Sequence, residues 1–197
     1  MDKVNLYILH TSLVKDNYEF VLSFVDEQRK ETALKYAHEK DRLLSLGAGY
    51  LLKKHLPNKE IKKTSSGKPF IEGGPQFNIS HSGEYVVLAI HPSRPVGVDI
   101  ERIDDKKLDA IKYVLNDEEK GINEVHDLFR IWSNKESLIK CTSIGLKDIR
   151  KVKGLPLERV REGYYTKSMI YDGYSLSITL KDEEPFELSL FKISTII

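Results

Sequence analysis

The chain has 197 residues, and its 31 Lys and Arg against 30 Asp and Glu give a formal net charge of +1. Such an even balance argues against a nucleic-acid-binding role, which usually appears as a strongly basic domain. Apolar residues make up 40% of the chain, enough for a packed core, but no run reaches the ~20 apolar residues of a membrane span. The single cysteine, Cys141, excludes an internal disulfide, so we expect a cytoplasmic protein without a signal peptide.

The first half of the chain is predicted to begin with a strand, continue through helices and end in short strands. Alternating apolar residues predict strands, and apolar residues three and four apart predict helices. The expected strands are Val4–His10, Phe77–Ile79, Tyr85–Ile90 and 96–101, and the expected helices are 18–25 and 28–55, the latter ended by Pro57. The polar run Ser80–Glu84 is expected to form the turn between the second and third strands.

The second half repeats this order of helices followed by strands. We expect helical pieces between 107 and 142, broken near Asn116 and Gly121, and then strands at 164–171, 174–180 and 186–193. Asp172-Gly173 is a strong signal for a hairpin between the first two of these strands. The sequence therefore predicts an α+β fold of two similar α/β halves, 1–102 and 103–197, related by a pseudo-two-fold and sharing a site at their seam.

The stretch Val96–Glu101 (VGVDIE) places Val96, Val98 and Ile100 on one face of a strand and two carboxylates, Asp99 and Glu101, on the other. Side chains two residues apart on a strand lie roughly 6–7 Å apart. Two carboxylates that close repel each other unless a positive charge lies between them. The pair therefore indicates either a divalent cation with oxygen ligands or an edge strand with a solvated acidic face.

A predicted helix in the second half carries a third carboxylate, Glu136, on the same side as an aromatic and a basic side chain. Trp132, Glu136 and Lys140 follow one another at intervals of four residues and so share one side of this helix. One interpretation is a surface Glu–Lys pair. The other is that Glu136 completes a magnesium site with Asp99 and Glu101, while Lys140 faces substrate phosphates.

Several basic residues are compatible with polyphosphate binding but also with ordinary structural roles. His81 could hold a phosphate or simply be a hydrogen-bonded turn residue, and Lys68 beside Pro69 is similarly ambiguous. A cluster of lysines at 53, 54, 62 and 63 is compatible with a solvated surface. Together with Lys140 and a metal, however, His81 and Lys68 are the parts needed to hold a polyphosphate.

Three motifs together resemble one enzyme family. FNISHSGEYVVLAI (77–90), VGVDIE (96–101) and WSNKESLIK (132–140) are similar to the signatures of the 4′-phosphopantetheinyl transferases, in particular the larger, pseudo-dimeric class. SSGKPF before the first motif and the helix KDRLLSLGAGYLL also fit, so the resemblance spans about residues 20–146. The resemblance implies transfer of the phosphopantetheine arm of coenzyme A to a serine of an acyl or peptidyl carrier protein, with release of 3′,5′-adenosine bisphosphate.

The resemblance also implies roles for individual residues. The magnesium ligands would be Asp99, Glu101 and Glu136, with Glu136 taking the proton from the carrier serine and Lys140 stabilising the departing phosphate. Further contacts to coenzyme A would come from Arg29, Arg42, Lys68, Pro69, Ser80 and His81. Arg29 and Arg42 correspond to basic residues for the 3′-phosphate, and the role of Lys135 stays open.

Ser143 departs from the family pattern, because the loop after Lys140 usually has glycine there, and Ser143 tolerates positive φ poorly. Lys106, Lys107 and Lys112 are either contacts to an acidic carrier helix or solvated lysines.

Three functions fit this sequence. The first is a magnesium-dependent phosphopantetheinyl transferase that works as a monomer on coenzyme A and a carrier protein. The second is a catalytically idle protein that binds coenzyme A or a carrier. The third, which does not depend on the resemblance, is a metal-dependent phosphoesterase that uses the same carboxylates with a water nucleophile.

Overall fold

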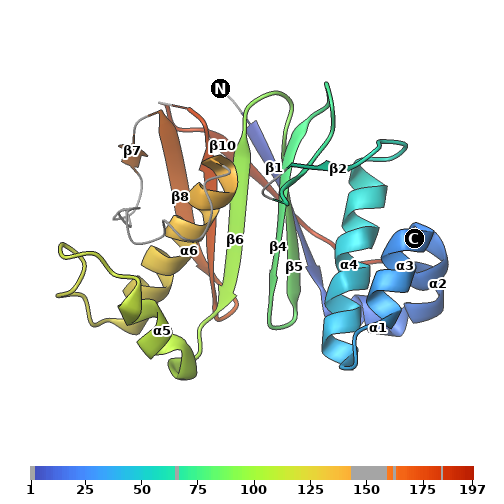
Figure 1. Cartoon of the computed structure of the whole chain (residues 1–197), viewed down its shortest axis with the longest axis horizontal. Helices are drawn as coiled ribbons and strands as arrows, with labels where there is room; N and C mark the ends of the chain where they lie inside the picture. The colour runs from blue at the N-terminus through green and yellow to red at the C-terminus, as the bar shows by residue number, and fades with distance from the viewer. Residues whose placement is uncertain (1–2, 65–66, 143–158, 162, 183) are drawn as a thin grey trace.

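Two four-stranded sheets lie side by side, and helices cover them on the outer flanks (Figure 1). We describe a computed structural model, in which residues 3–64, 67–142, 159–161, 163–182 and 184–197 are placed. The predicted mixture of helices and strands is confirmed. Within the described residues, no helix is long and apolar enough to cross a membrane.

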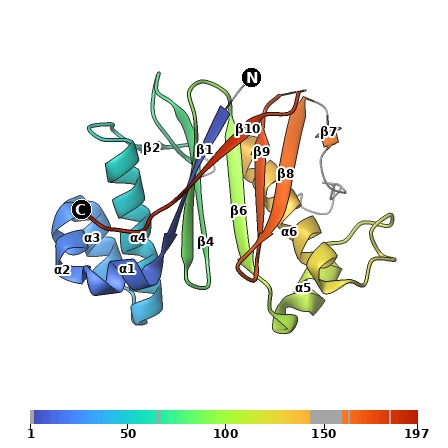
Figure 2. The same ribbon diagram turned by 180° about the vertical axis from the view of Figure 1, so that it is seen from behind.

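The first sheet has the strand order β10-β1-β5-β4. Its strands are β1 (Lys3–His10), β4 (Gln76–Ser82), β5 (Tyr85–His91) and β10 (Glu187–Lys192). The central strand β5 is almost entirely apolar and buried, since β1 and β4 pair with its two edges. The last strand, β10, comes from the far end of the chain and runs parallel to β1, so the C-terminal residues return to the first half (Figure 2).

The second sheet has the strand order β6-β9-β8-β7 and is antiparallel throughout. Its strands are β6 (Val96–Arg102), β7 (Arg159–Arg161), β8 (Tyr164–Tyr171) and β9 (Tyr174–Leu180). Asp172 and Gly173 join β8 to β9 with φ angles of 48° and 77°. Two successive positive φ values are typical of the type I′ turn, so the predicted hairpin is confirmed.

The helices form one group on each flank. The elements are α1 (Thr11–Asp16), α2 (Tyr18–Phe24), α3 (Glu27–Leu34), α4 (Glu39–His55), a 3₁₀ turn η1 (Asp105–Lys107), α5 (Leu108–Tyr113) and α6 (Val125–Thr142). A small two-stranded sheet of β2 (Lys62–Lys63) and β3 (Pro69–Phe70) follows α4. Helix α4 rests on β5 at Gly47, where an added Cβ would lie 3.2 Å from Val86. The buried leucines of α4 pack against the first four-stranded sheet and form one apolar core with it.

The prediction of one continuous helix over 28–55 was wrong, because two helices, α3 and α4, occupy this range. The chain turns between Leu34 and Glu39, and α3 packs back against α4. A single helix of that length would extend for about 40 Å and leave much of its apolar face uncovered. Helix α1 and the short strand β7 were not predicted either.

The prediction of a turn at Ser80–Glu84 was also wrong in part. Residues Ser80 to Ser82 continue the strand β4, and the turn is confined to Gly83 and Glu84. Gly83 has a φ of 59°, which suits glycine in this tight turn. The polar side chains that suggested a turn instead make contacts with the neighbouring strand β6, described below.

A buried ion pair ties α6 to the segment that precedes it. The Lys135 ammonium lies 2.6 Å from Glu119 and also donates to the carbonyl of Val114, and both charged side chains are buried. Glu119 accepts two more hydrogen bonds, from the backbone and side-chain nitrogens of Asn116. The pair therefore fixes the polypeptide between α5 and α6 against the face of α6 that carries Lys135.

We expect Lys135→Met to lower the free energy of unfolding by about 3–5 kcal/mol, because it leaves Glu119 buried without its counter-charge. Urea unfolding measures this loss. Lys120→Met is the control, since Lys120 forms an exposed pair with Asp117 and should cost less than about 1 kcal/mol. Equal midpoints for the two variants would contradict the role given to the Lys135–Glu119 pair.

Candidate functional site

The two sheets meet where β4 lies beside β6, and polar side chains of β4 make the join. Asn78, Ser80 and Ser82 accept hydrogen bonds from alternate backbone amides of β6. The donors are Val98, Ile100 and Arg102, at 2.9, 3.4 and 3.1 Å. Side chains of one strand thus satisfy backbone groups of the other, where a ladder between two main chains would otherwise stand.

The hydroxyl groups of Ser80 and Ser82 also bind the acidic residues of β6. Ser80 Oγ donates to Asp99 at 3.0 Å, and Ser82 Oγ donates to Glu101 at 2.9 Å. Asp99 is only 4% exposed, and the side chain of Glu101 is 17% exposed. The predicted pair of carboxylates is therefore not a solvated acidic face but lies on the inner boundary between the sheets.

Helix α6 brings Lys140 against these acids and carries Glu136 one turn earlier. Lys140 Nζ lies 2.6 Å from Asp99 and donates to Ser80 at 3.0 Å. Helix α6 can approach β6 because Gly97 has no side chain. An added Cβ there would meet the carbonyl oxygen of Ser137 at 2.0 Å and the amide of Cys141 at 2.5 Å. The Glu136–Lys140 pair is accordingly not a surface pair.

Burial and like charge shape the electrostatics of this site. Burial raises the pKa of Asp99 although Lys140 opposes the change. Burial, followed by the charge of Asp99, raises the pKa of Glu136 to about 7. A carboxyl group with such a pKa can accept or donate a proton near neutral pH. The effect of Asp99 on Glu136 also indicates that the two carboxylates are close enough to interact.

The carboxylates can be tested for their fit to a metal ion. Asp99 Oδ2 is buried and has no hydrogen-bond partner among the described residues, which leaves an oxygen lone pair available. One oxygen of each β6 carboxylate has a lysine partner, since Lys140 contacts Oδ1 of Asp99 and Lys107 contacts Oε1 of Glu101. Within the described part of the chain, no three acidic, histidine or cysteine side chains are already gathered as a metal cluster. The all-oxygen donor set nevertheless suits magnesium once the lysines turn to a substrate.

A pocket lies on the other face of β4, against α4. Because side chains alternate along a strand, Ser80 and Ser82 face β6 while His81 faces α4. The pocket is lined by Arg29, Tyr36, Asp41, Leu44, Ser45, Ala48 and His81. Burial and the charge of Lys140 lower the pKa of His81, and Asp41 opposes them. The pocket and the acidic site therefore share a single strand as their common wall.

Arg29 reaches this pocket across a glycine. A Cβ added to Gly49 of α4 would lie 2.6 Å from Cγ of Arg29. The backbone amide of Arg29 is fixed by the N-cap residue Asp26, whose carboxylate accepts from it at 2.8 Å. The structure thus brings Arg29 and His81 together in one pocket, and anion binding by these two residues stays a prediction.

The remaining predicted contacts lie nearby but in different settings. Arg42 donates to the carbonyl of Tyr36 at 3.3 Å and is not among the residues that line the described pocket. Lys68 donates to the carbonyl of Cys141 near the C-terminal end of α6, and burial lowers its pKa. Pro69 begins β3 directly after Lys68. Ser143 lies outside the described residues.

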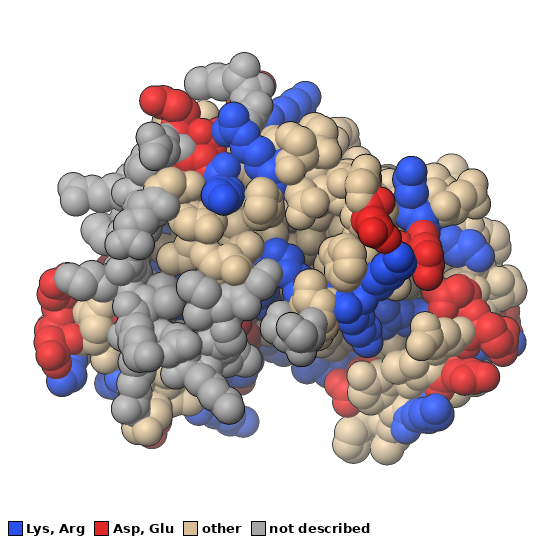
Figure 3. Space-filling model, turned by 45° about the horizontal axis from the view of Figure 1, so that its top comes forward, with Lys and Arg blue, Asp and Glu red and all other residues tan. Residues whose placement is uncertain are grey.

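Sequence reasoning missed several residues of the site. Ser82 and Asn78 share the face of β4 with Ser80, and the two-residue spacing that singled out Asp99 and Glu101 could have revealed them. Lys107 was expected to be either a carrier contact or a solvated lysine, and its contact with Glu101 was not foreseen. Asp41 and Ser45 of the pocket lie within the helix KDRLLSLGAGYLL, but the resemblance gave neither residue a role of its own. Figure 3 shows several Lys and Arg side chains near the middle of the face that it presents.

Comparison with known protein families covers almost the whole chain. Residues 95–191 match the model described as 4′-phosphopantetheinyl transferase superfamily, and residues 12–93 match the model 4′-phosphopantetheinyl transferase, N-terminal. The chain therefore belongs to the 4′-phosphopantetheinyl transferase superfamily, and the resemblance inferred from its three motifs is confirmed.

Individual relatives point to one type within this superfamily. The chain is 35% identical over 144 residues to 4′-phosphopantetheinyl transferase gsp of Aneurinibacillus migulanus, covering 66% of this chain and 60% of that protein. It is 31% identical over 151 residues to 4′-phosphopantetheinyl transferase Sfp of Bacillus subtilis, covering 68% and 67%. It is 34% identical to a Xenopus laevis L-aminoadipate-semialdehyde dehydrogenase-phosphopantetheinyl transferase, over 44% of this chain and 36% of the relative. The chain is thus of the Sfp type, although the alignments span only part of these proteins.

We expect Gly97→Ala to lower the free energy of unfolding by about 1–3 kcal/mol, because its Cβ would collide with backbone atoms of α6 that cannot turn aside. Urea unfolding gives the value. Gly121→Ala is the matched control: Gly121 is exposed, no described atom lies within 4 Å of its added Cβ, and the change should stay within about 0.5 kcal/mol. A Gly97→Ala variant as stable as wild type would show that α6 does not depend on this contact.

Proposed function

We propose that this chain transfers the 4′-phosphopantetheine arm of coenzyme A to a serine of an acyl or peptidyl carrier protein. The observation that supports the proposal is the contact of Lys140 with Asp99 on one side of β4, one helical turn after Glu136 on α6, with the Arg29–His81 pocket on the other side of β4. The first group can act on a pyrophosphate, and the second can hold a further phosphate. Membership of the superfamily supports the same assignment.

The reaction we propose is an attack on phosphorus. The carrier serine Oγ forms a bond to the phosphorus that bears the pantetheine arm. The bond from that phosphorus to the bridging oxygen breaks, and its electron pair leaves with 3′,5′-adenosine bisphosphate. The carboxylate of Glu136 takes the serine proton, directly or through a water molecule. The product is therefore a phosphodiester on the carrier, and no oxidant or reductant is needed.

The residues of the site would have three roles: to bind a metal ion, to stabilise the charge of the departing phosphate, and to hold these groups in position. Asp99, Glu101 and Glu136 would hold a magnesium ion, which supplies positive charge to the pyrophosphate. Lys140 would turn from Asp99 to the departing phosphate and stabilise its negative charge. Ser80 lies between Asp99 and Lys140 and would hold both in place.

Binding of coenzyme A would use both faces of β4. Arg29 and His81 would bind the 3′-phosphate in the pocket, with Arg42 as a further basic residue at its edge. Lys68 and Pro69 would border the adenine. These assignments follow the superfamily resemblance, and the shared pocket of Arg29 and His81 supports them.

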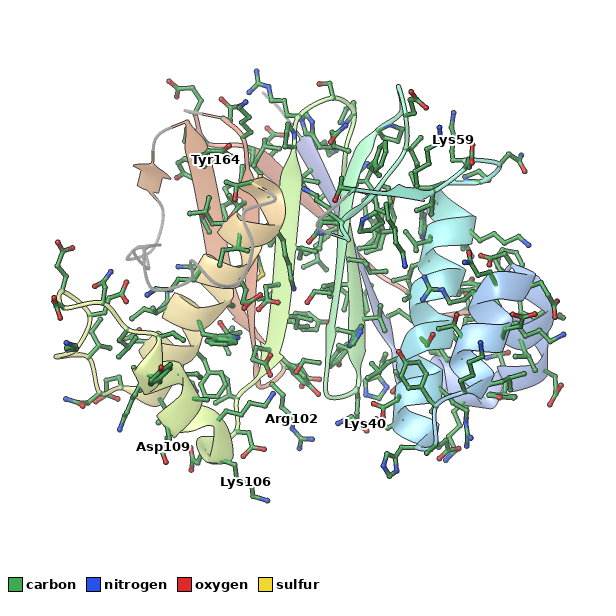
Figure 4. The ribbon with its side chains drawn as sticks, viewed as in Figure 1. Lys40, Lys59, Arg102, Lys106, Asp109 and Tyr164 are labelled. Carbon is green, nitrogen blue, oxygen red and sulfur yellow. The ribbon has the colours of Figure 1, made fainter. Side chains whose placement is uncertain are left out.

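A carrier protein would approach the second half near α5. Lys106 and Asp109 lie at the outer end of this segment and point away from the sheet (Figure 4). Lys106 and Lys112 are exposed, and Tyr113 is 71% exposed, so an acidic helix could bind there through charge and one aromatic contact.

The pseudo-two-fold arrangement belongs to the same proposal. Residues 1–102 and 103–197 would be the two halves, each with one long helix, α4 or α6, and four strands of the two main sheets. Strand β6 of the first half lies in the second sheet, and β10 of the second half lies in the first. A chain that holds both halves would work as a monomer, although β10 exchanges sheets to pair with β1. The single cysteine suits a cytoplasmic location.

The test is intact-mass spectrometry of an apo carrier domain incubated with this protein, coenzyme A and magnesium chloride. We expect the carrier to gain the mass of one phosphopantetheine and to lose this gain when EDTA is present. Binding of coenzyme A without any gain across acyl and peptidyl carriers would favour the idle binder. Cleavage of coenzyme A without a carrier would favour the phosphoesterase.

We expect Glu136→Gln to lower the rate of carrier modification by at least about 10²-fold, because the amide can neither accept the serine proton nor supply an anionic ligand. Asp127→Asn is the matched control on the same helix, since Asp127 is exposed and pairs only weakly with Arg130. Unfolding midpoints of both variants should stay close to that of wild type. A Glu136→Gln variant with the wild-type rate would overturn the role proposed for Glu136.

A further inference from the structure

Helix α6 rests on the second sheet through buried hydroxyl groups. The hydroxyl cluster consists of Ser133 and Ser137 on α6, Thr166 and Ser168 on β8, and Ser175, Ser177 and Thr179 on β9. Ser133, Ser137, Ser175, Ser177 and Thr179 are 0% exposed, and Thr166 is 3% exposed. Neither the superfamily assignment nor the proposed chemistry uses these residues.

The hydrogen bonds of the cluster cross the helix–sheet interface at two levels. At one level, Ser137 lies 2.8 Å from Thr179. At the other, one turn earlier, Ser133 lies 2.8 Å from Ser175 and 2.7 Å from Ser177. Ser133 and Ser137 are four residues apart, so they lie on the same side of α6. Two separated contacts fix both the position of a helix along its axis and its rotation.

The cluster lies in direct register with the acidic strand. On β9, Thr179, Ser177 and Ser175 pair with Gly97, Asp99 and Glu101 of β6. Directly paired residues have side chains on the same face of a sheet. The face that supports α6 is therefore continuous with the face that carries the acids. Ser137, which contacts Thr179, also has its carbonyl over Gly97.

Stability alone does not account for so many buried hydroxyls. A buried hydroxyl loses its hydrogen bonds to water, and matched apolar pairs of similar shape can be equally stable. Apolar side chains, however, can slide past one another at small cost, whereas short hydrogen bonds have a defined distance and direction. The cluster thus favours a single position of α6 over nearby alternatives.

We propose that the hydroxyl cluster fixes the position of α6 on the sheet, and that Ser137 and Thr179 are positioning residues for Glu136 and Lys140. Glu136 precedes Ser137 directly, and Lys140 follows it by less than one turn. Any shift of α6 at Ser137 therefore moves both functional side chains relative to Asp99. The functional part of this inference rests on the proposed transfer reaction.

The number of protons on each hydroxyl shows which residue donates in the hydrogen bond between Thr179 and Ser137. Ser137 Oγ donates to the carbonyl of Asn134 at 3.0 Å, and a hydroxyl has only one proton to donate. Thr179 must then donate to Ser137, and Thr166, 2.8 Å from Thr179, donates to Thr179. Removing the hydroxyl of Thr166 leaves the bond to the helix intact, whereas removing that of Thr179 breaks it.

The experiment compares Thr179→Val with Thr166→Val, two substitutions of the same shape in neighbouring strands of one sheet. We expect Thr179→Val to weaken Mn²⁺ binding, measured by electron paramagnetic resonance, by about tenfold. The turnover number kcat for carrier modification should fall by about tenfold, with KM for coenzyme A changed less than twofold. Thr166→Val should leave all three values within about twofold. Its urea midpoint should fall less than that of Thr179→Val, because Thr166 takes part in one of these hydrogen bonds and Thr179 in two.

Thr179→Ser provides the rescue, since it keeps the hydroxyl, and it should bind Mn²⁺ as wild type does. Equal Mn²⁺ affinities in Thr179→Val and wild type, or equal losses in Thr179→Val and Thr166→Val, would overturn the inference.

The inference can fail separately from the proposed function. If wild type binds Mn²⁺ but modifies no carrier, the transferase proposal fails, and Mn²⁺ affinity still decides the positioning role. If wild type binds no Mn²⁺, hydrogen exchange of the α6 amides around Glu136–Lys140 decides it. Faster exchange in Thr179→Val than in Thr166→Val supports the inference, and equal exchange rates overturn it.

Discussion

The rest of the site depends on the join between β4 and β6, which side chains make in place of a backbone ladder. Asn78, Ser80 and Ser82 accept from the backbone of β6, and the two serines also donate to Asp99 and Glu101. A hydroxyl can do both because it has one proton and two lone pairs. The same residues therefore join the two sheets and orient the acids, so neither task can change without the other.

The second constraint is steric, and glycines meet it because they have no side chain. Gly97 lets α6 lie against β6, Gly49 leaves room for Arg29, and Gly47 lets α4 approach β5. Gly49 leaves room for a predicted site residue directly, whereas Gly97 and Gly47 each let a helix approach a strand. Lys140 and Arg29 consequently lie on opposite sides of β4, Lys140 against Ser80 and Arg29 in the pocket with His81.

Local patterns predicted most strands and the acidic pair, because alternation of apolar residues depends only on neighbours in sequence. They failed where a polar residue has a distant partner. Ser80 and Ser82 suggested a turn, since nothing near them in sequence indicates that the β6 backbone lies opposite. The return of β10 to β1 was hidden for the same reason, whereas Lys107 lies only six residues from its partner Glu101 and was missed although both are near in sequence. The residues that meet at the site were recognisable by motif, but their geometry was not.

The charge balance of the site explains why it can be both stable and reactive. Asp99 is almost fully buried, yet one of its oxygens has no partner among the described residues, and the other is held by Lys140 and Ser80. A buried carboxylate with incomplete hydrogen bonding destabilises the protein unless a positive charge is near. Lys140 supplies that charge in this structure, and in the proposed reaction a metal would supply it when Lys140 turns to a phosphate. The ammonium and the metal ion would then alternate as partners of Asp99, so that its charge would be balanced in both states. A fold that needs such an exchange must also keep α6 in place while Lys140 moves, which is a demand on helix position rather than on overall stability.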